Sequence, residues 1–158
     1  MSDPRPSQRS KTSTATLTFS DDDIIGKYAY HFNGYTMLNN IRYNLVGVGS
    51  LEIGKHGKIS GRHRSSITPL QGQKAQLQTG VYNLKGDIKL DRTGMGDATI
   101  HFKKARGDGV DVDGKFFVQI AGTPDRLWFI SSGATLPQSK GIAADELVTL
   151  EAVRMGGR

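Results

Sequence analysis

Apolar and polar side chains alternate along most of the chain from Gly26 onward, which is the pattern of half-buried β-strands. In the first such stretch, 28–38, the side chains of Tyr28, Tyr30 and Phe32 share one face. No segment shows the apolar period of an amphipathic helix of about 12 residues or more. Further strands are predicted over 43–53, 58–67, 80–90, 98–103, 115–121, 126–132 and 146–155.

The predicted strands are separated mostly by short turns. Gly54-Lys55-His56-Gly57 predicts a hairpin, because glycine accepts the positive φ of a tight reversal. Residues 107–114 resemble a calcium loop but lack its closing glutamate, so an Asp/Gly hairpin is favoured. Longer connections are predicted over 71–79, as a surface loop or a lid, and over 134–145, as an irregular rim loop.

Short turns without crossover helices imply antiparallel neighbours, and closing the sheet removes its exposed edges. The sequence therefore predicts an all-β fold, a single antiparallel up-and-down barrel of about eight strands, over residues 24–158. Residues 1–23 are rich in Ser, Thr, Pro and Arg, and predict a flexible tail that is disordered or swaps a strand. Within it, the alternating residues 14–19 could add a short strand or cross the barrel mouth, and Asp21-Asp22-Asp23 predicts a solvated charge run.

Composition narrows the classes of function. The 158 residues suit one domain, and the lack of cysteine excludes disulfides and thiolate chemistry. We expect a cytoplasmic protein without a membrane span, since no apolar run resembles a signal peptide or a spanning helix. The net charge is +6, but strand alternation splits the densest basic groups, 62–64 and 103–106, between two faces. No specific nucleic-acid partner is therefore expected.

Three motifs resemble those of a known group of proteins. GKYAYHF (26–32), VGVGSLEI (46–53) with its Gly-x-x-Gly turn, and GVY (80–82) resemble the GxYxFxF, AGVGxLxFDGxG and GxYxV patterns of small bacterial barrels. That group is similar to lipocalin-like and allene-oxide-cyclase-like barrels of the calycin type. The resemblance implies the fold and carries over no catalytic residue, since the motifs consist of structural glycines and aromatics. This chain departs from the pattern at His31 and at Lys55-His56.

The lumen and rim of such a barrel are the expected site. If Tyr28 points inward, the lumen is aromatic and suits a hydrophobic or polyene-like small molecule. The alternative is that the same side chains fill the barrel as core. Gly47 and Gly49 share one face and would leave room for a bulky neighbour or let the strand coil. The predicted ligand-binding residues are Tyr28, Tyr30, Phe32, Leu51, Ile53, Tyr82, Phe116, Val118 and Trp128.

Polar residues within the predicted strands are candidates for acid–base chemistry. Glu52, Glu151 and His31 are the predicted catalytic residues, because a carboxyl group that faces an apolar lumen has a raised pKa. A solvated position on the outer face is the alternative. The histidines at 31, 63 and 101 lie on separate strands, but no ligand spacing supports a metal site, so neither a metal nor a cofactor is predicted.

Three functions stay open. The first is binding of a small hydrophobic molecule in the lumen, and the second is a cofactor-independent cyclase or isomerase that positions a flexible hydrophobic substrate. The third is an oligomeric interaction module, whose partners would be copies of this chain and which needs an apolar outer patch. The sequence lacks a nucleophile elbow, a P-loop and a dinucleotide fingerprint, which argues against hydrolase, kinase and dehydrogenase chemistry.

Overall fold

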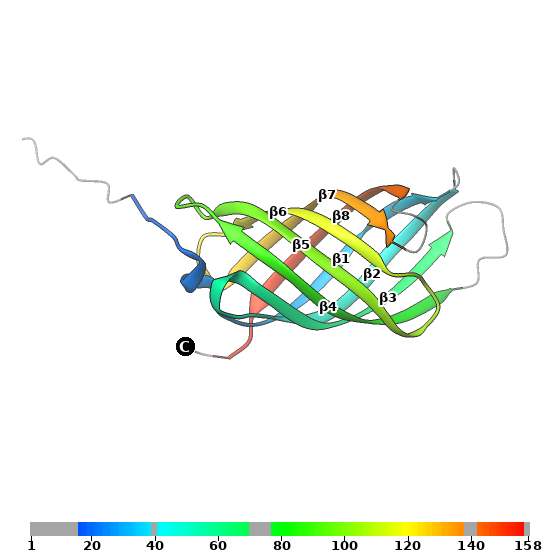
Figure 1. The fold of residues 1–158 in the computed structure, drawn as a ribbon, viewed down its shortest axis with the longest axis horizontal. Helices are drawn as coiled ribbons and strands as arrows, with labels where there is room; N and C mark the ends of the chain where they lie inside the picture. The colour runs from blue at the N-terminus through cyan, green and yellow to red at the C-terminus, as the bar shows by residue number, and fades with distance from the viewer. Residues whose placement is uncertain (1–15, 39–40, 70–76, 138–141, 157–158) are drawn as a thin grey trace, which may run out of the picture.

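The chain folds into one closed β-barrel. A computed structural model describes residues 16–38, 41–69, 77–137 and 142–156 (Figure 1). Each strand pairs antiparallel with the next and β8 pairs with β1, so the predicted up-and-down barrel is confirmed. The strands are β1 (Gly26–Leu38), β2 (Ile41–Ile53), β3 (Lys58–Pro69), β4 (Gln78–Leu90), β5 (Met95–Gly107), β6 (Val112–Ile120), β7 (Arg126–Leu136) and β8 (Ile142–Arg154).

Alternation decides which side chains enter the lumen. On β6, Phe116 and Val118 are buried while Lys115 and Phe117 are exposed. The same two-residue period continues around the barrel, so each strand contributes one row to the lumen and one to the outer surface. The helical segments that the structure describes are short 3₁₀ turns, and none is long and apolar enough to cross a membrane.

The predicted rim loop over 134–145 is wrong at both of its ends. Strand β7 extends to Leu136 and β8 begins at Ile142, and these two residues pair with each other. The pairing register shifts between Ile130 and Ala134, which marks a bulge in β7. Because a bulge interrupts the two-residue period, the sequence pattern stops being recognisable as a strand there.

The predicted hairpins at 54–57 and 107–114 are confirmed. Gly54 leads into η2 (Lys55–Gly57), in which His56 and Gly57 both have positive φ, 59° and 70°. A Cβ atom at Gly57 would lie 2.0 Å from the carbonyl oxygen of Ile88, so glycine is required by space as well as by φ. Between β5 and β6, the carboxylate of Asp111 accepts the backbone N–H of Lys104 at 2.8 Å.

One end of the barrel is closed by the segment before β1. The charge run 21–23 lies in η1 (Asp21–Ile24), where Asp22 and Asp23 are exposed as predicted, while Asp21 accepts the N–H of Leu90 at 3.0 Å. Ile24 is fully buried, and its carbonyl oxygen accepts the Tyr28 hydroxyl at 2.8 Å. We call this the closed end and the segment η1 its plug; η1 lies at the left of Figure 1.

The segment that precedes η1 also contacts the barrel. Residues 16–20 form neither helix nor strand, and Phe19 packs against the core while its N–H donates to the carbonyl of Arg92 at 3.0 Å. Of the two alternatives for 14–19, the short strand is therefore not formed over residues 16–19, whereas Phe19 does lie against the end of the barrel. The tail prediction for residues 1–15 and the predicted loop over 71–76 lie outside the described residues.

Candidate ligand site in the barrel lumen

The half of the lumen beside η1 is filled by apolar side chains. Five of the predicted ligand-binding residues belong to this buried core and are at most 3% exposed. They pack with side chains such as Phe129 and Leu127, which are fully buried. These five residues are core residues rather than cavity-lining ones: Tyr28, Leu51, Ile53, Phe116 and Val118.

The other half of the lumen contains a cavity of about 210 Å³. An apolar cavity of roughly 150 Å³ can hold a benzene ring, so this space fits a small molecule. Its wall combines aromatic and aliphatic side chains with a few polar groups, as small-molecule sites do. The lining residues are Phe32, Thr36, Leu45, His63, Ser65, Ile67, Gln78, Tyr82, Phe102, Gly109, Val110, Val112, Leu136 and Glu146.

The base of the cavity is a histidine enclosed by four aromatic rings. His63 is 3% exposed, and its ring lies parallel to that of Tyr30 with 5.8 Å between centroids. The rings of Phe32, Phe102 and Tyr82 lie 4.7, 5.3 and 5.8 Å from it. The Tyr30 hydroxyl is hydrogen-bonded to Nδ1 of His63 at 2.7 Å.

The two same-face glycines of β2 make room for these rings, as predicted. A Cβ atom at Gly47 would lie 2.2 Å from the Phe32 ring and 2.6 Å from the His63 ring. At Gly49 it would lie 2.6 Å from the Tyr30 hydroxyl. Both glycines are inward positions where the ring cluster occupies the space of a side chain.

Burial fixes the protonation state of the His63–Tyr30 pair. Desolvation lowers the pKa of His63 to about 4, so the imidazole is neutral at pH 7. Desolvation also raises the pKa of Tyr30 well above its ordinary value, so its hydroxyl keeps the proton. Because the protonated hydroxyl needs an acceptor and Nδ1 lies at hydrogen-bond distance, we assign the hydroxyl as the donor and place the imidazole proton on Nε2. Nε2 makes no hydrogen bond to a described residue and is left as a donor beside the cavity.

Glu146 is the acidic group of the cavity. It lies on β8 in the same inward row as the buried Val148 and Leu150. Desolvation raises the pKa of its carboxyl group to about 7. Near neutral pH the group is therefore divided between acid and carboxylate, which is the state that suits proton transfer.

Tyr82 extends along the wall toward the β5–β6 hairpin. Burial raises the pKa of its hydroxyl, and the charges of Asp111 and Asp108 raise it further, while a hydrogen bond with Ser65 acts in the opposite direction. A Cβ atom at Gly109 would lie 2.1 Å from the hydroxyl oxygen, so the hairpin closes directly over it.

The other predicted ligand-binding residues are divided between lumen and surface. Phe32 and Tyr82 line the cavity, and Tyr30 lies below it. The inward placement of Trp128 is wrong, because Leu127 and Phe129 are the inward residues of β7 and Trp128 is 50% exposed.

The three predicted catalytic residues lie outside the lumen. Glu52 is exposed and 4.0 Å from Lys27, and Glu151 forms an ion pair with Arg126 at 3.2 Å. His31 is exposed on β1. Their catalytic role stays a prediction, without support from their position.

Two titratable groups that face the cavity, His63 and Glu146, are not among the site residues predicted from the sequence. The alternation along β8 could have identified Glu146, because Val148, Leu150 and Ala152 show that its row faces inward. The three strand histidines do not converge, because His101 pairs with Asp113 on the surface at 2.6 Å. Among the described residues, no group of three or more His, Asp or Glu is placed to hold a metal ion.

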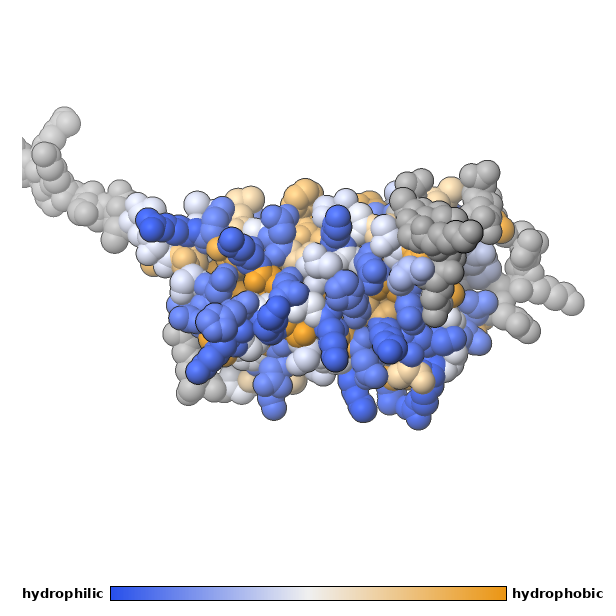
Figure 2. All heavy atoms as spheres, in the orientation of Figure 1, coloured by the Kyte–Doolittle hydropathy of each residue, from blue (hydrophilic) through white to orange (hydrophobic). Residues whose placement is uncertain are grey.

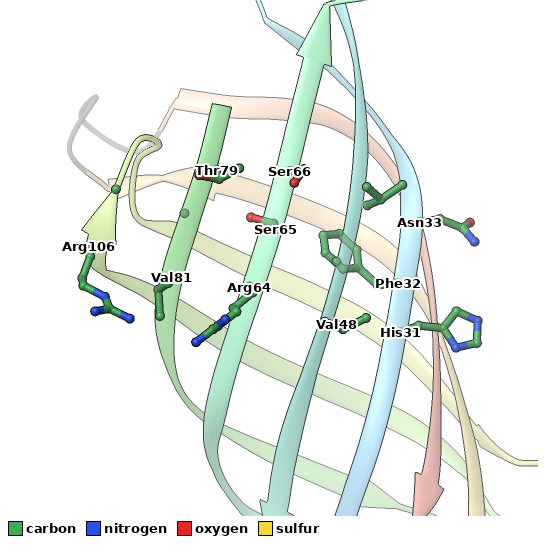
Figure 3. A pocket seen from close by; sticks show the side chains of 14 residues that line it. His31, Phe32, Asn33, Val48, Arg64, Ser65, Ser66, Thr79, Val81 and Arg106 are labelled. Atoms are coloured by element: carbon green, nitrogen blue, oxygen red, sulfur yellow. The ribbon is translucent and has the colours of Figure 1, made fainter. Parts of the chain in front are cut away.

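A second hollow, of about 770 Å³, lies on the outer surface of β1–β5 (Figure 3). Arg64 and Arg106 project on one side of it and His31 on the other, with Val48 between them, and Val46 lies on the same strand, β2, between β1 and β3. The two valines are 53% and 59% exposed, so this hollow is shallow and leaves a small molecule largely in solvent. The lumen cavity is therefore the better candidate for a small-molecule site.

Comparison with known proteins gives no information on this site. The chain matches no protein-family model, and neither curated proteins nor solved structures include a significant match. The resemblance to lipocalin-like and allene-oxide-cyclase-like barrels stays a prediction.

Proposed function

We propose that this protein binds a small, mostly apolar molecule in the open half of its barrel. The observation that carries the proposal is the cavity of about 210 Å³ above the His63 ring cluster. Aromatic walls supply the apolar contact, and the few polar groups supply orientation. The resemblance to lipocalin-like barrels supports the same class of function without adding a residue.

The polar groups of the cavity define the ligand further. The Nε2–H of His63 favours a ligand with a hydrogen-bond acceptor, such as a carbonyl or hydroxyl oxygen. A charged ligand is disfavoured, because burying an unpaired charge is costly. The filled half of the lumen favours a compact ligand, such as one ring with a short substituent, over a long polyene.

Native mass spectrometry of the freshly purified protein, before and after organic-solvent extraction, tests the proposal. We expect a bound neutral molecule that is lost on extraction, and saturable binding of acetophenone to the extracted protein. Val112→Phe, which fills the cavity, should abolish acetophenone binding, whereas Lys89→Gln on the outer face should leave it unchanged. Binding of equal strength in both variants would refute a lumen site.

A second candidate function is that of an isomerase. The observation that favours it is that Glu146 and His63 line the same apolar cavity, one able to exchange a proton and the other a fixed donor. With a β,γ-unsaturated ketone, the Glu146 carboxylate would remove the proton on the carbon between carbonyl and double bond. His63 would donate a hydrogen bond to the resulting enolate oxygen, and Glu146 would return the proton to the γ-carbon.

The probe 3-cyclohexenone separates the two functions. An isomerase converts it to 2-cyclohexenone, and in D₂O the product carries deuterium. Glu146→Gln should lower this rate by roughly 10²-fold or more while binding persists, since it removes only the proton carrier. Binding without conversion in the unaltered protein would leave the binding function and exclude isomerisation of this substrate class.

A further inference from the structure

The outer wall of the barrel carries an unusual group of apolar side chains. Phe117, Trp128 and Ile130 point outward from β6 and β7, and Met95 and Val153 flank them on β5 and β8. Each is between 43% and 61% exposed. We call these five residues the apolar face. An exposed cluster of this kind marks an interaction surface.

Strand register places the apolar face in adjacent outward rows, with Gln119 between Met95 and Trp128 and with Asp97 beside Phe117. Phe117 pairs directly with Ile130, and Trp128 lies two residues from Ile130 on the same side of β7. At the border, Arg126 and Glu151 form an ion pair, so the face carries no net charge there. Aromatic side chains surrounded by a polar border are the usual composition of a protein interface.

The basic side chains are gathered on the opposite wall. Pairing places Arg62, Asn83 and Lys103 in one outward row, and Arg64, Val81 and Arg106 in the next. In the circular strand order, β3 and β4 lie opposite β7 and β8. Figure 2, viewed as in Figure 1 with β4 and β5 toward the reader, shows this wall crowded with hydrophilic side chains.

This separation of charge restricts where two copies of the chain could meet. A chain of net charge +6 repels its own copies, except where they meet through a neutral face that keeps the basic walls apart. We propose that the apolar face joins two copies of this chain in a two-fold dimer. In such a dimer the same patch serves both subunits, and the two basic walls point away from each other.

Trp128 is the single tryptophan of the sequence and reports directly on this interface. Sedimentation velocity over an about hundredfold concentration range should show conversion from the mass of one chain to twice that mass. Over the same range, Trp128 emission should shift to shorter wavelength and its quenching by acrylamide should fall, as the indole leaves water. A monomer at every concentration would overturn the proposal.

Three variants locate the interface. Trp128→Lys and Phe117→Ser should each raise the dimer dissociation constant about 30-fold or more, the effect of removing an interface anchor. Val48→Lys is the matched control, because Val48 is equally exposed but lies on β2, and it should change the constant less than about twofold. Far-UV circular dichroism checks that each variant keeps its β-structure.

The remaining outcomes are also decisive. Dimers that persist in both Trp128→Lys and Phe117→Ser, or that dissociate in Val48→Lys, would place the interface elsewhere and overturn the proposal. An assembly larger than two chains would overturn the two-fold arrangement.

Discussion

The two halves of the lumen are built from the same strands and differ in kind. On β3, Ile59 packs in the closed half, whereas His63 and Ser65 face the cavity two and three inward positions further on. On β8, the buried Leu150 gives way to Glu146 in the same row. On these two strands alternation continues from one half to the other, so the change from a packed to a hollow lumen follows the change of residue type along the inward row.

This difference separates the half of the lumen that stabilises the fold from the half whose groups are suited to chemistry. The closed half is apolar and tightly filled, which supplies the hydrophobic stabilisation of the fold. The open half holds the lumen groups with shifted pKa values, including His63 and Glu146, whose desolvation reduces stability. Such a cost is typical of sites kept for function rather than for folding.

Truncating one ring in each half gives the largest expected contrast. Phe129 is fully buried and packs edge-on against Phe116, so Phe129→Ala should lower the free energy of unfolding by about 4 kcal/mol. Phe102 already borders a cavity, so Phe102→Ala should lower it by only about 2 kcal/mol. Urea denaturation followed by circular dichroism measures both, and equal losses would mean that the open half is packed as firmly as the closed one.

The pH dependence of stability should come from the open half. The pKa of His63 falls from 6.5 to about 4 on folding, so its contribution is lost as pH decreases from 6.5 to 4. The pKa of Glu146 rises from 4.5 to about 7, so its contribution is lost as pH increases from 4.5 to 7. The two slopes oppose each other, and the intact protein should have nearly constant stability between pH 4.5 and 6.5.

Substituting either of these two residues should reveal the pH dependence of stability that the other one contributes. Glu146→Gln should show stability that rises with pH by about 3 kcal/mol between pH 4 and 6.5, because only His63 then titrates. His63→Phe should show a fall of about 3 kcal/mol between pH 4.5 and 7. Glu52→Gln, on the outer surface, should keep the flat profile. If stability changed with pH in the same way in all three variants, the opposing contributions of His63 and Glu146 would be refuted.

The glycines of β2 offer a smaller test of the same contrast. Gly47→Ala places a methyl group against the Phe32 and His63 rings, and this overpacking should lower the free energy of unfolding by about 1 to 3 kcal/mol. Gly133 has no atom within 4 Å of its Cβ position, so Gly133→Ala is the control, with a change within about 0.5 kcal/mol. Thermal denaturation compares the two, and an unaffected Gly47→Ala would mean that the ring cluster is loosely held.

Most of the barrel could be predicted from the sequence, because alternation and turn glycines are local signals. Strand existence, closure and the inward face of Tyr28 follow from them. The ends of β7 and β8 could not be predicted, since the bulge after Ile130 hides the period. The plug around Ile24 depends on contacts with distant residues such as Pro124, which no local pattern reveals.

The candidate site was less predictable than the fold. Alternation along the strands predicts that Phe32 and Tyr82 face inward. It does not distinguish an inward residue that is packed in the core from one that lines a cavity. Glu52 and Glu151 have a residue type suited to acid–base chemistry, but their rows face solvent. The inward prediction for Trp128 fails because an aromatic side chain alone does not show which face of a strand is inward, whereas the positions of Leu127 and Phe129 do.

Two tyrosine hydroxyls, one in each half, give the smallest expected effects. Tyr28 donates to the carbonyl oxygens of Ile24 and Pro124, at 2.8 and 3.0 Å, and so holds the plug. Tyr30 donates to His63. Tyr28→Phe and Tyr30→Phe should each lower the free energy of unfolding by about 1 to 2 kcal/mol, the cost of one buried hydrogen bond.

Of these two substitutions, only Tyr30→Phe should change the tautomer of His63. With the Tyr30 hydroxyl removed, nothing holds the imidazole proton on Nε2, so ¹⁵N chemical shifts of His63 should change from one tautomer to a mixture. Tyr28→Phe, equal in size and in lost hydrogen bonding, should leave those shifts unchanged, since its hydroxyl contacts the plug. A mixture of tautomers already present in the unaltered protein would mean that the open half does not fix its donor, and that the polar groups of the cavity are not oriented toward a ligand.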